Sequence, residues 1–349
     1  MDQRTPLRAT RLTPAWLLGS LMALIVVSVV SLGIGPVDIA PHRVAGAVLS
    51  ELPGVNIDHG LDPVQHTIVT TVRLPRVVLG LLVGAMLAIS GAAYQGSFRN
   101  PLADPYLLGV AAGAGLGATL AIVNDWGSAV GFIDPVPLAA FLGALLAVAV
   151  AFSVGSIGSR SSVTLILAGV AVASFFTAAQ TYVLQRNIDV VQEVYSWILG
   201  RVSTSGWGEV KLLLPYAIAT IVVLLRFGRA LDVMAVGDDE ARSLGVDPVR
   251  VRLVVVTLAS LAAAATVAVA GLIGFVGLVV AHAVRLTAGS SNRIVLPLSA
   301  IFGATFMVLA DLLARNVIAP AELPVGVVTA FVGAPFFAVI LRTTRRTLW

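Results

Sequence analysis

Charged side chains gather in one short stretch of an otherwise apolar chain. Residues 226–252 hold ten of the forty Asp, Glu, Lys and Arg residues. Asp238 is expected to be the N-cap of a short helix here, because a carboxylate accepts hydrogen bonds from the free N–H groups of a first turn. Gly245 suits a left-handed turn, and Asp247-Pro248 is a common helix start. The pattern predicts a charged helix–turn–helix element that meets a soluble partner, with a solvated loop as the alternative.

The patterns that support nucleotide hydrolysis or metal chemistry are missing from the sequence. A phosphate-binding Walker loop needs a lysine that follows glycine, and Lys211, the only lysine, follows a valine. The four histidines, His42, His59, His66 and His282, lack the i, i+4 spacing of a helical metal site. The chain has no cysteine, which excludes thiolate ligands and disulfides. We expect no catalytic residue, no metal site and no cofactor on this chain.

One carboxylate stands inside a predicted membrane span. Asp311 lies four residues before Arg315, so both side chains are expected on one face of a helix. An ionisable group within a membrane can bind a proton or a cation, as in carriers driven by an ion gradient. Such carriers usually have more charged groups at mid-membrane than this chain offers. We therefore favour a local ion pair, and an ion-gradient-driven secondary transporter is the alternative function.

The composition excludes an ordinary soluble domain. The chain is 58 % hydrophobic and only 11 % charged, whereas soluble proteins carry about 25 % charged residues. Apolar runs recur at the length of about 17–25 residues that crosses a bilayer as a helix. The runs are continuous, so alternating barrel strands are not expected. Basic residues are scattered between these runs, which argues against a nucleic-acid partner. The sequence predicts an all-α polytopic membrane protein.

About ten transmembrane helices are expected. They are residues 14–34, 70–97, 104–123, 135–157, 163–184, 209–225, 250–269, 271–284, 294–314 and 323–341. With ten crossings, fifteen arginines fall in ends and loops on the side of both termini, and seven basic residues fall on the other. Because positive loops stay in the cytoplasm, both termini and residues 226–252 are expected there. The apolar core of the first span is too long for a signal peptide, so we expect it to be retained.

Other segments are predicted to pack closely or to lie outside the spans. An amphipathic helix is expected near residues 41–52, and a surface helix within residues 186–208. The glycines Gly271, Gly274 and Gly277 indicate a thin, closely packed or re-entrant eighth span. The ladder Gly109, Gly113 and Gly117 favours close helix packing, with a mobile pathway wall as the alternative.

Seven long motifs stand out along the chain. They are RLPR at 73–76, GAMLAISGAAYQGSFRNPLADPYLLGVAAGAG at 84–115, LILAG at 165–169, GDDEARSLGV at 237–246, GLIGFVGLVVAHAVRL at 271–286, LPLSAIFGATFMVLADLLAR at 296–315 and ELPVGVVTAFVGAPFF at 322–337. Together they resemble the permease subunits of large ABC importers, the family that takes up iron-siderophores, haem and cobalamin. The resemblance covers the chain from about residue 70 to its end, with the motifs in the family's order and spacing.

The resemblance implies one permease domain over residues 1–349, in a bacterial plasma membrane. Residues 1–69 would hold the first span and an outer segment, and residues 70–225 would hold spans two to six. Residues 226–252 would be a cytoplasmic coupling segment, and residues 253–349 would hold spans seven to ten. The implied partners are a second permease subunit (the same or a related chain), two cytoplasmic ATPases that hold ATP and Mg²⁺, an extracytoplasmic substrate-binding protein, and membrane lipid. The chain would transport a metal chelate by alternating access without being an enzyme. Iron-siderophore, haem and cobalamin remain open as cargo, and an iron chelate is the commonest in the family.

The resemblance also implies a coupling role for one motif. The motif corresponds to the coupling helices that sit in a cleft of each ATPase. Its residues are Gly237, Asp238, Asp239, Glu240, Ala241, Arg242, Ser243, Leu244, Gly245 and Val246.

Two further roles follow from the same resemblance. Arg73, Arg76 and Arg315 match arginines that face outward and pair with glutamates of the binding protein. The cytoplasmic gate, which narrows the inner mouth of the pathway, corresponds to Asn100, Leu102, Ser162 and Val163.

Two departures from the family pattern lie on the predicted cytoplasmic side. Ala281 stands before His282 where the family usually has proline, so the helix there is expected to run straighter. Residues 289–293 read Gly-Ser-Ser-Asn-Arg where Gly-x-Asp-His-Arg is usual. We expect these changes to affect the loop conformation near the ATPase.

Overall fold

The computed structural model describes residues 12–51, 53–55, 57–126, 134–155, 162–202 and 206–344, and these form helices without a strand. The α-helices are α1 (Pro14–Gly33), α2 (Pro41–Ser50), α3 (Pro63–Thr67), α4 (Leu74–Phe98), α5 (Val110–Val123), α6 (Pro135–Gly155), α7 (Ser162–Arg186), α8 (Val191–Ile198), α9 (Gly208–Arg226), α10 (Gly228–Met234), α11 (Asp238–Ser243), α12 (Pro248–Ala270), α13 (Val276–Thr287), α14 (Asn292–Asn316) and α15 (Val325–Thr344). A π-helical segment, η1 (Ile68–Arg73), joins α3 to α4, and η2 (Pro105–Leu108) and η3 (Ile188–Val190) are 3₁₀ helices.

Each predicted span contains an apolar helix. Within the described residues, seven helical runs are long and apolar enough to cross a membrane: Pro14–Gly33, Pro63–Phe98, Pro135–Gly155, Thr164–Arg186, Gly208–Arg226, Pro248–Ala270 and Asn292–Asn316. Three shorter apolar helices, Val110–Val123, Val276–Thr287 and Val325–Val339, coincide with the remaining predicted spans. The expectation of an all-α polytopic membrane protein with about ten spans is confirmed.

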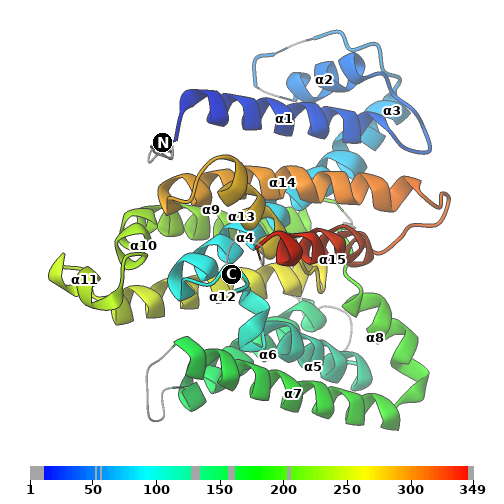
Figure 1. The fold of residues 1–349 in the computed structure, drawn as a ribbon. Coiled ribbons are helices and arrows are strands. Elements are labelled where there is room, and N and C mark those ends of the chain that lie inside the picture. The colour runs from blue at the N-terminus through cyan, green and yellow to red at the C-terminus, as the bar shows by residue number, and fades with distance from the viewer. Residues whose placement is uncertain are drawn as a thin grey trace.

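Helix α4 lies at the centre of the molecule (Figure 1), and 83 % of the most apolar window in its helical run is buried. Its small residues let neighbouring helices approach closely, which is how helices associate in lipid. A methyl group on Gly84 would overlap the carbonyl oxygen of Gly303 in α14. One on Gly91 would overlap the backbone of Gly277 in α13. Two partners of α4 are therefore held at glycine-to-glycine contacts.

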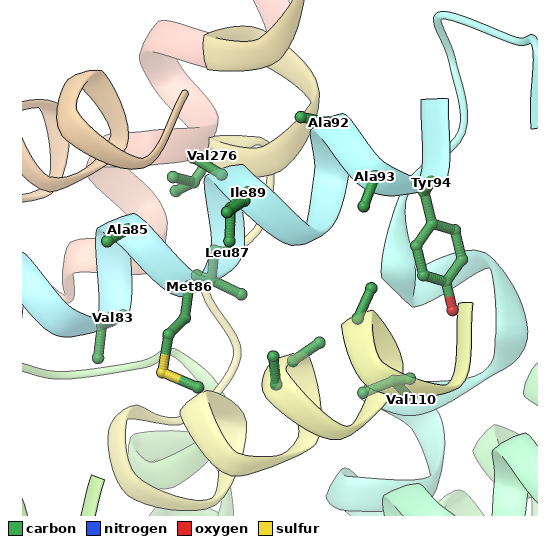
Figure 2. Close-up of a cluster of buried hydrophobic side chains, with 14 of the residues drawn as sticks. Val83, Ala85, Met86, Leu87, Ile89, Ala92, Ala93, Tyr94, Val110 and Val276 are labelled. Atoms are coloured by element: carbon green, nitrogen blue, oxygen red, sulfur yellow. The ribbon is translucent and has the colours of Figure 1, made fainter. Parts of the chain in front are cut away.

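Side chains of α4 fill the space toward α12. Figure 2 shows Met86 and Tyr94 extending from α4 toward the yellow helix below it. Both are fully buried, and the Tyr94 hydroxyl forms a hydrogen bond with the hydroxyl of Ser260 in α12. A buried hydroxyl without a partner would be costly, so this contact fixes how the two helices face each other.

Helices α5, α6 and α7 form a second packed group, at the bottom of Figure 1. A methyl group on Gly113 would overlap the carbonyl oxygen of Gly143 in α6, and one on Gly117 would overlap that of Ala139. Gly109 differs, because it adopts φ of +82° just before α5. This geometry supports the packing interpretation of the glycine ladder for Gly113 and Gly117.

The eighth span is a short helix preceded by non-helical backbone. Helix α12 ends at Ala270 and is followed by Gly271, whose φ is +71°. Helix α13 has 12 residues, which span about 18 Å of a hydrocarbon core of about 30 Å. Non-helical backbone at membrane depth needs partners within the protein. The Tyr106 hydroxyl supplies one, donating to the carbonyl of Ile273 at 3.0 Å.

The bundle has two distinguishable ends (Figure 1). Helices α10 and α11 lie at one, which we call the α11 end, and α2, α3 and α8 lie toward the other, the α8 end. The helices predicted near residues 41–52 and within 186–208 are present as α2 and α8.

Candidate functional site

The charged stretch forms a helix, a tight turn and a second helix. Helix α11 ends just before Gly245, whose φ of +81° is the left-handed conformation that glycine adopts without steric cost. The carboxylate of Asp247 accepts hydrogen bonds from the N–H groups of Val249 and Arg250 and so caps α12. The predicted turn and second cap are thus present.

The expected cap of α11 was wrong. Gly237 is its N-cap, and Asp238 is the first helical residue. The Asp238 carboxylate lies 3.1 Å from the guanidinium of Arg99, which follows α4. It also accepts hydrogen bonds of 3.2 Å, on both oxygens, from Nη2 of Arg252 in α12. The two guanidinium groups carry full positive charges, which attract the carboxylate more strongly than the partial charge of a backbone N–H does, and this explains the outcome.

A second carboxylate of this stretch binds the start of α14. Asp232 in α10 accepts hydrogen bonds from the Ser291 hydroxyl at 2.6 Å and from the backbone N–H of Asn292. Ser291 makes no cap bond with its own side chain. The first turn of α14 is therefore capped by a side chain of α10. Ser291 and Asn292, which make this contact, belong to residues 289–293, where the sequence differs from the usual family pattern.

The other departure lies in an unbroken helix. Ala281 is buried within α13, which continues past it to Thr287. Farther along this helix, Arg285 donates to the side-chain oxygens of Gln95 at 3.3 Å and Asn292 at 3.0 Å. Helix α13 is thus continuous through Ala281, and its Arg285 connects α4 to the start of α14.

Two of the predicted gate residues stand in the turn after α4. The Asn100 side-chain oxygen accepts a hydrogen bond of 2.9 Å from the N–H of Leu102, and Leu102 is exposed. Ser162 and Val163 begin α7, and their side chains lie outside the described part of the structure. The structure therefore brings Asn100 and Leu102 to the α11 end, beside Arg99.

At the α8 end a buried carboxylate joins two of the predicted docking arginines. Asp311 in α14 accepts hydrogen bonds of 2.8–3.1 Å from the Arg76 guanidinium in α4. Nε of Arg315 lies 3.1 Å from Oδ2 of the same carboxylate, in an ion pair whose N–H is not aligned as a hydrogen bond. The predicted Asp311–Arg315 pair is present, and Arg76 is a partner the spacing did not indicate.

Glu322 closes this cluster from the loop between α14 and α15. Its two oxygens accept hydrogen bonds from Nη1 and Nη2 of Arg76 at 3.0 and 2.8 Å. These bonds lower the pKa of Glu322 from its ordinary value, against the effect of burial. We call Arg76, Asp311, Arg315 and Glu322 the Asp311 cluster.

Arg73, the third predicted docking residue, is buried. Its guanidinium donates to the backbone carbonyls of Leu32 at 2.7 Å, Gly33 at 3.0 Å and Val37 at 2.7 Å. These carbonyls include the end of α1, which an α-helix leaves without intrahelical donors. In this structure Arg73 fastens the end of α1 to the start of α4, and its docking role stays a prediction.

Two cavities open beside α8. One of about 460 Å³ is lined by residues that include Arg76, Tyr195, Arg201 and Glu322. The other, of about 1110 Å³, shares Arg201 and is otherwise lined mainly by apolar and acidic side chains, including Trp197. Among the described residues, no group of three His, Cys, Asp or Glu side chains could hold a metal ion. The described residues that line these two cavities therefore form no metal site of that kind.

The contacts that define both ends come largely from residues to which the sequence had assigned no role. Arg99 and Glu322 are single charges in short loops, and their isolation beside long apolar runs was the available signal, because an unpaired charge there is costly. Asp232 and Arg252 lie within the charged stretch 226–252, where their number gave no indication of which charges pair. Their partners, however, lie far away in the chain.

A polytopic helical bundle with a charged helix–turn–helix at one end has the architecture of a membrane transport subunit. Residues 23–343 match the FecCD transport family, and the chain belongs to this family. It is an ABC transporter permease and a multi-pass membrane protein. Its homologues are permease subunits, which lack a nucleotide-binding domain of their own.

Individual relatives cover nearly the whole chain. The cobalamin import system permease protein BtuC of Halobacterium salinarum is 38 % identical over 94 % of this chain and 96 % of its own length. The iron(3+)-hydroxamate import system permease protein FhuB of Bacillus subtilis is 36 % identical over 95 % of this chain and 84 % of its own. A metal-chelate type ABC transporter in an inward-facing conformation superimposes with a TM-score of 0.82, at 31 % identity, over 95 % of this chain and 100 % of the solved one. These likenesses agree with the resemblance seen in the motifs.

Proposed function

We propose that this chain is the permease half of an ATP-driven importer that moves a metal chelate into the cytoplasm. The observation that carries the proposal is the α11–Gly245–α12 element, a charged helix–turn–helix at one end of an apolar bundle. Relatives named for cobalamin and iron–hydroxamate import, and a structural relative of metal-chelate type, support this cargo class. An iron-siderophore, haem or cobalamin each fits it.

The working assembly in this proposal has two permease subunits and two ATPases. The α11 end faces the cytoplasm, and residues 237–246 sit in a cleft of the ATPase, which binds ATP and Mg²⁺. Both termini lie on the cytoplasmic side, as the arginine distribution indicates. Exposed acidic and basic side chains of α11, such as Asp239 and Arg242, are suited to a polar, reversible interface.

An extracytoplasmic binding protein docks at the α8 end. Arg76 and Arg315 are near this surface, and Glu322, the most exposed member of the Asp311 cluster, marks where a partner's carboxylate would approach Arg76. Arg73 lies beneath them as support for α1. Charged groups at such a surface would chiefly speed and orient docking.

Transport in this scheme is alternating access between the two ends. Asn100 and Leu102, with Ser162 and Val163, narrow the inner mouth. The substrate passes a wall that holds it weakly, in keeping with the lack of a ligating cluster among the described residues.

The paired state of Asp311 supports this function over an ion-gradient carrier. To bind a proton or a sodium ion, a buried carboxylate has to give up its ion pairs, and breaking a buried ion pair is costly. Asp311 instead has a guanidinium on either side, Arg76 and Arg315, and its side chain is only 3 % exposed.

Uptake into proteoliposomes tests the proposal. The complex is purified with its ATPase and binding protein and reconstituted with ATP at the α11 side. Labelled ferric siderophore, haem and cobalamin are offered outside, each with the binding protein. Accumulation of one cargo only with ATP and the binding protein is the expected result. Accumulation driven by a proton or sodium gradient without ATP would overturn the proposal.

A further inference from the structure

The coupling element and the predicted gate are joined by one carboxylate. Asp238 is the first residue of α11, and Arg99 is the residue between α4 and Asn100. One oxygen of Asp238 lies 3.1 Å from Nη2 of Arg99. Chain positions 139 residues apart are thus tied at the α11 end, through the turn that carries Asn100 and Leu102.

Arg252 makes the connection a three-way contact. While its Nη2 donates to both oxygens of Asp238, its Nε donates to the carbonyl of Ser97 at 3.1 Å. Ser97 lies in the last turn of α4, where a carbonyl lacks an intrahelical donor. The Arg252 side chain is 10 % exposed, so it links α11 to the end of α4 from a largely dry position.

The turn itself is tightly specified. Arg99 adopts φ of +50°, the left-handed conformation that commonly ends a helix. Asn100 then accepts the N–H of Leu102 at 2.9 Å. The N–H of Asn100 donates to the carbonyl of Gln95 at 3.2 Å, and that of Ala103 to the carbonyl of Asn100 at 3.1 Å. Because these bonds fix the backbone of the turn, a force applied at the Arg99 guanidinium displaces the turn as a unit.

The backbone connections of α11 lead to a different part of the bundle. The N–H groups of Gly245 and Val246 donate to the carbonyls of Arg242 and Ala241 at 3.0 and 2.9 Å, and these bonds close the turn into α12. The contacts that lead from α11 to the turn after α4 are those of the Asp238 side chain.

We propose that Asp238 is a positioning residue that transmits displacement of α11 to the turn after α4, through Arg99 and Arg252. This inference rests on the proposed function, since it takes the ATPase as the source of the displacement. It adds a specific link: the carboxylate of Asp238 lets the conformation of residues 99–102 follow the ATPase cycle.

Thiol labelling in the assembled complex tests the link. The chain has no cysteine, so Leu102→Cys introduces a single reactive position in the permease. Its reaction with a membrane-impermeant maleimide is measured from the α11 side with and without ATP, in a complex with cysteine-free partner subunits. Cargo taken up per ATP hydrolysed is measured separately in the chain without this cysteine.

The expected result separates hydrolysis from transport. With Asp238→Asn, cargo per ATP falls about tenfold, as expected for loss of a coupling contact, while ATP hydrolysis continues. The ATP-dependent change in labelling at position 102 disappears. Arg99→Gln gives the same loss without touching the buried Arg252 contact, and Arg99→Lys, which keeps the charge, restores part of it.

The matched control is Asp125→Asn. It makes the same chemical change at an exposed position after α5, outside residues 226–252, and asparagine tolerates the left-handed φ of +42° found there. Its labelling response and cargo per ATP should equal those of the parent.

The outcomes distinguish this inference from the proposed function. A parent complex that shows no ATP-dependent uptake of any chelate overturns the proposed function. A parent complex that transports, with unchanged labelling and cargo per ATP in Asp238→Asn and Arg99→Gln, overturns the link alone. Loss in Arg99→Gln without rescue by Arg99→Lys also counts against it, since a charge contact should be rescued by charge.

Discussion

The two ends of the molecule contain the same motif in different surroundings. At the α8 end Asp311 lies between Arg76 and Arg315, and at the α11 end Asp238 lies between Arg99 and Arg252. The Asp311 side chain is 3 % exposed, whereas that of Asp238 is 29 % exposed. Both triads join α4 to another helix.

Burial gives these triads different physical roles. In a buried site, breaking one ion pair leaves an uncompensated charge away from water, which is costly. The three groups of such a triad therefore stay paired. In a partly wet site, water and salt compete for each charge, so the contact can break and re-form. The comparison indicates that the triad at the α8 end is a permanent contact between α4 and α14, whereas the triad at the α11 end can break and re-form.

The largest expected effect comes from removing the buried carboxylate. Asp311→Ala leaves two nearly buried guanidinium groups without their shared anion, and the free energy of unfolding should fall by about 3–5 kcal/mol. The measurement is unfolding of the purified chain in detergent by SDS titration. Asp189→Ala, at an exposed position in η3, is the control and should change stability by less than about 0.5 kcal/mol. A loss below about 1 kcal/mol for Asp311→Ala would contradict a permanent contact between α4 and α14 through Asp311.

The next effect concerns Arg73, which fastens α1. Arg73→Ala removes the donor of three backbone carbonyls, and we expect a loss of about 2–3 kcal/mol with faster proteolysis between α1 and α2. The matched control is Arg43→Ala, because Arg43 makes one exposed bond of 3.5 Å to Gly60. Equal proteolysis of the two variants would argue that Arg73 does not hold α1.

The α11 end should respond less in stability. Asp238→Ala is expected to cost about 1 kcal/mol, since solvent reaches its carboxylate. The loss in free energy of unfolding caused by Asp238→Ala should become smaller in high salt, because salt screens exposed charges. The loss caused by Asp311→Ala should stay nearly constant. SDS titration at low and high ionic strength measures both. A salt-independent loss at Asp238 would place it with the buried triad and weaken the contrast.

The smallest effect is expected at Glu322, where the Asp311 cluster meets solvent. Its side chain is 49 % exposed, and Glu322→Gln should cost less than about 1 kcal/mol. The pKa of Glu322 is lowered in the folded chain, so its stabilising effect is fully present above the ordinary value of about 4.3. It is lost as the pH falls through the lowered folded pKa.

A pH series of melting temperatures checks this sign. The difference between the parent and Glu322→Gln should be constant from neutral pH to about 5 and vanish in stronger acid, because the parent then also carries a neutral side chain. A difference that grows on acidification would show that Glu322 does not act through an ion pair with Arg76.

The sequence by itself determined the class of protein and the outline of its fold. Apolar runs have a length set by the bilayer, so each predicted span contains an apolar helix. Local chemistry also fixed the Gly245 turn and the Asp247 cap, because φ preference and first-turn hydrogen bonds involve neighbouring residues. The Asp311–Arg315 pair could be predicted because a helix places residues four apart on one face.

Only the tertiary structure decided which charges meet. Asp238 was expected to cap its own helix, and it binds Arg99 and Arg252 instead, since packing of α11 against α4 and α12 brings stronger partners to it. Arg73 was assigned to docking on the outer side, which stays a prediction, and its burial against the end of α1 could not be read from the sequence. Spacing along one helix carries no information on partners that other helices supply, and a charge beside lipid binds whichever partner the packed bundle brings within reach.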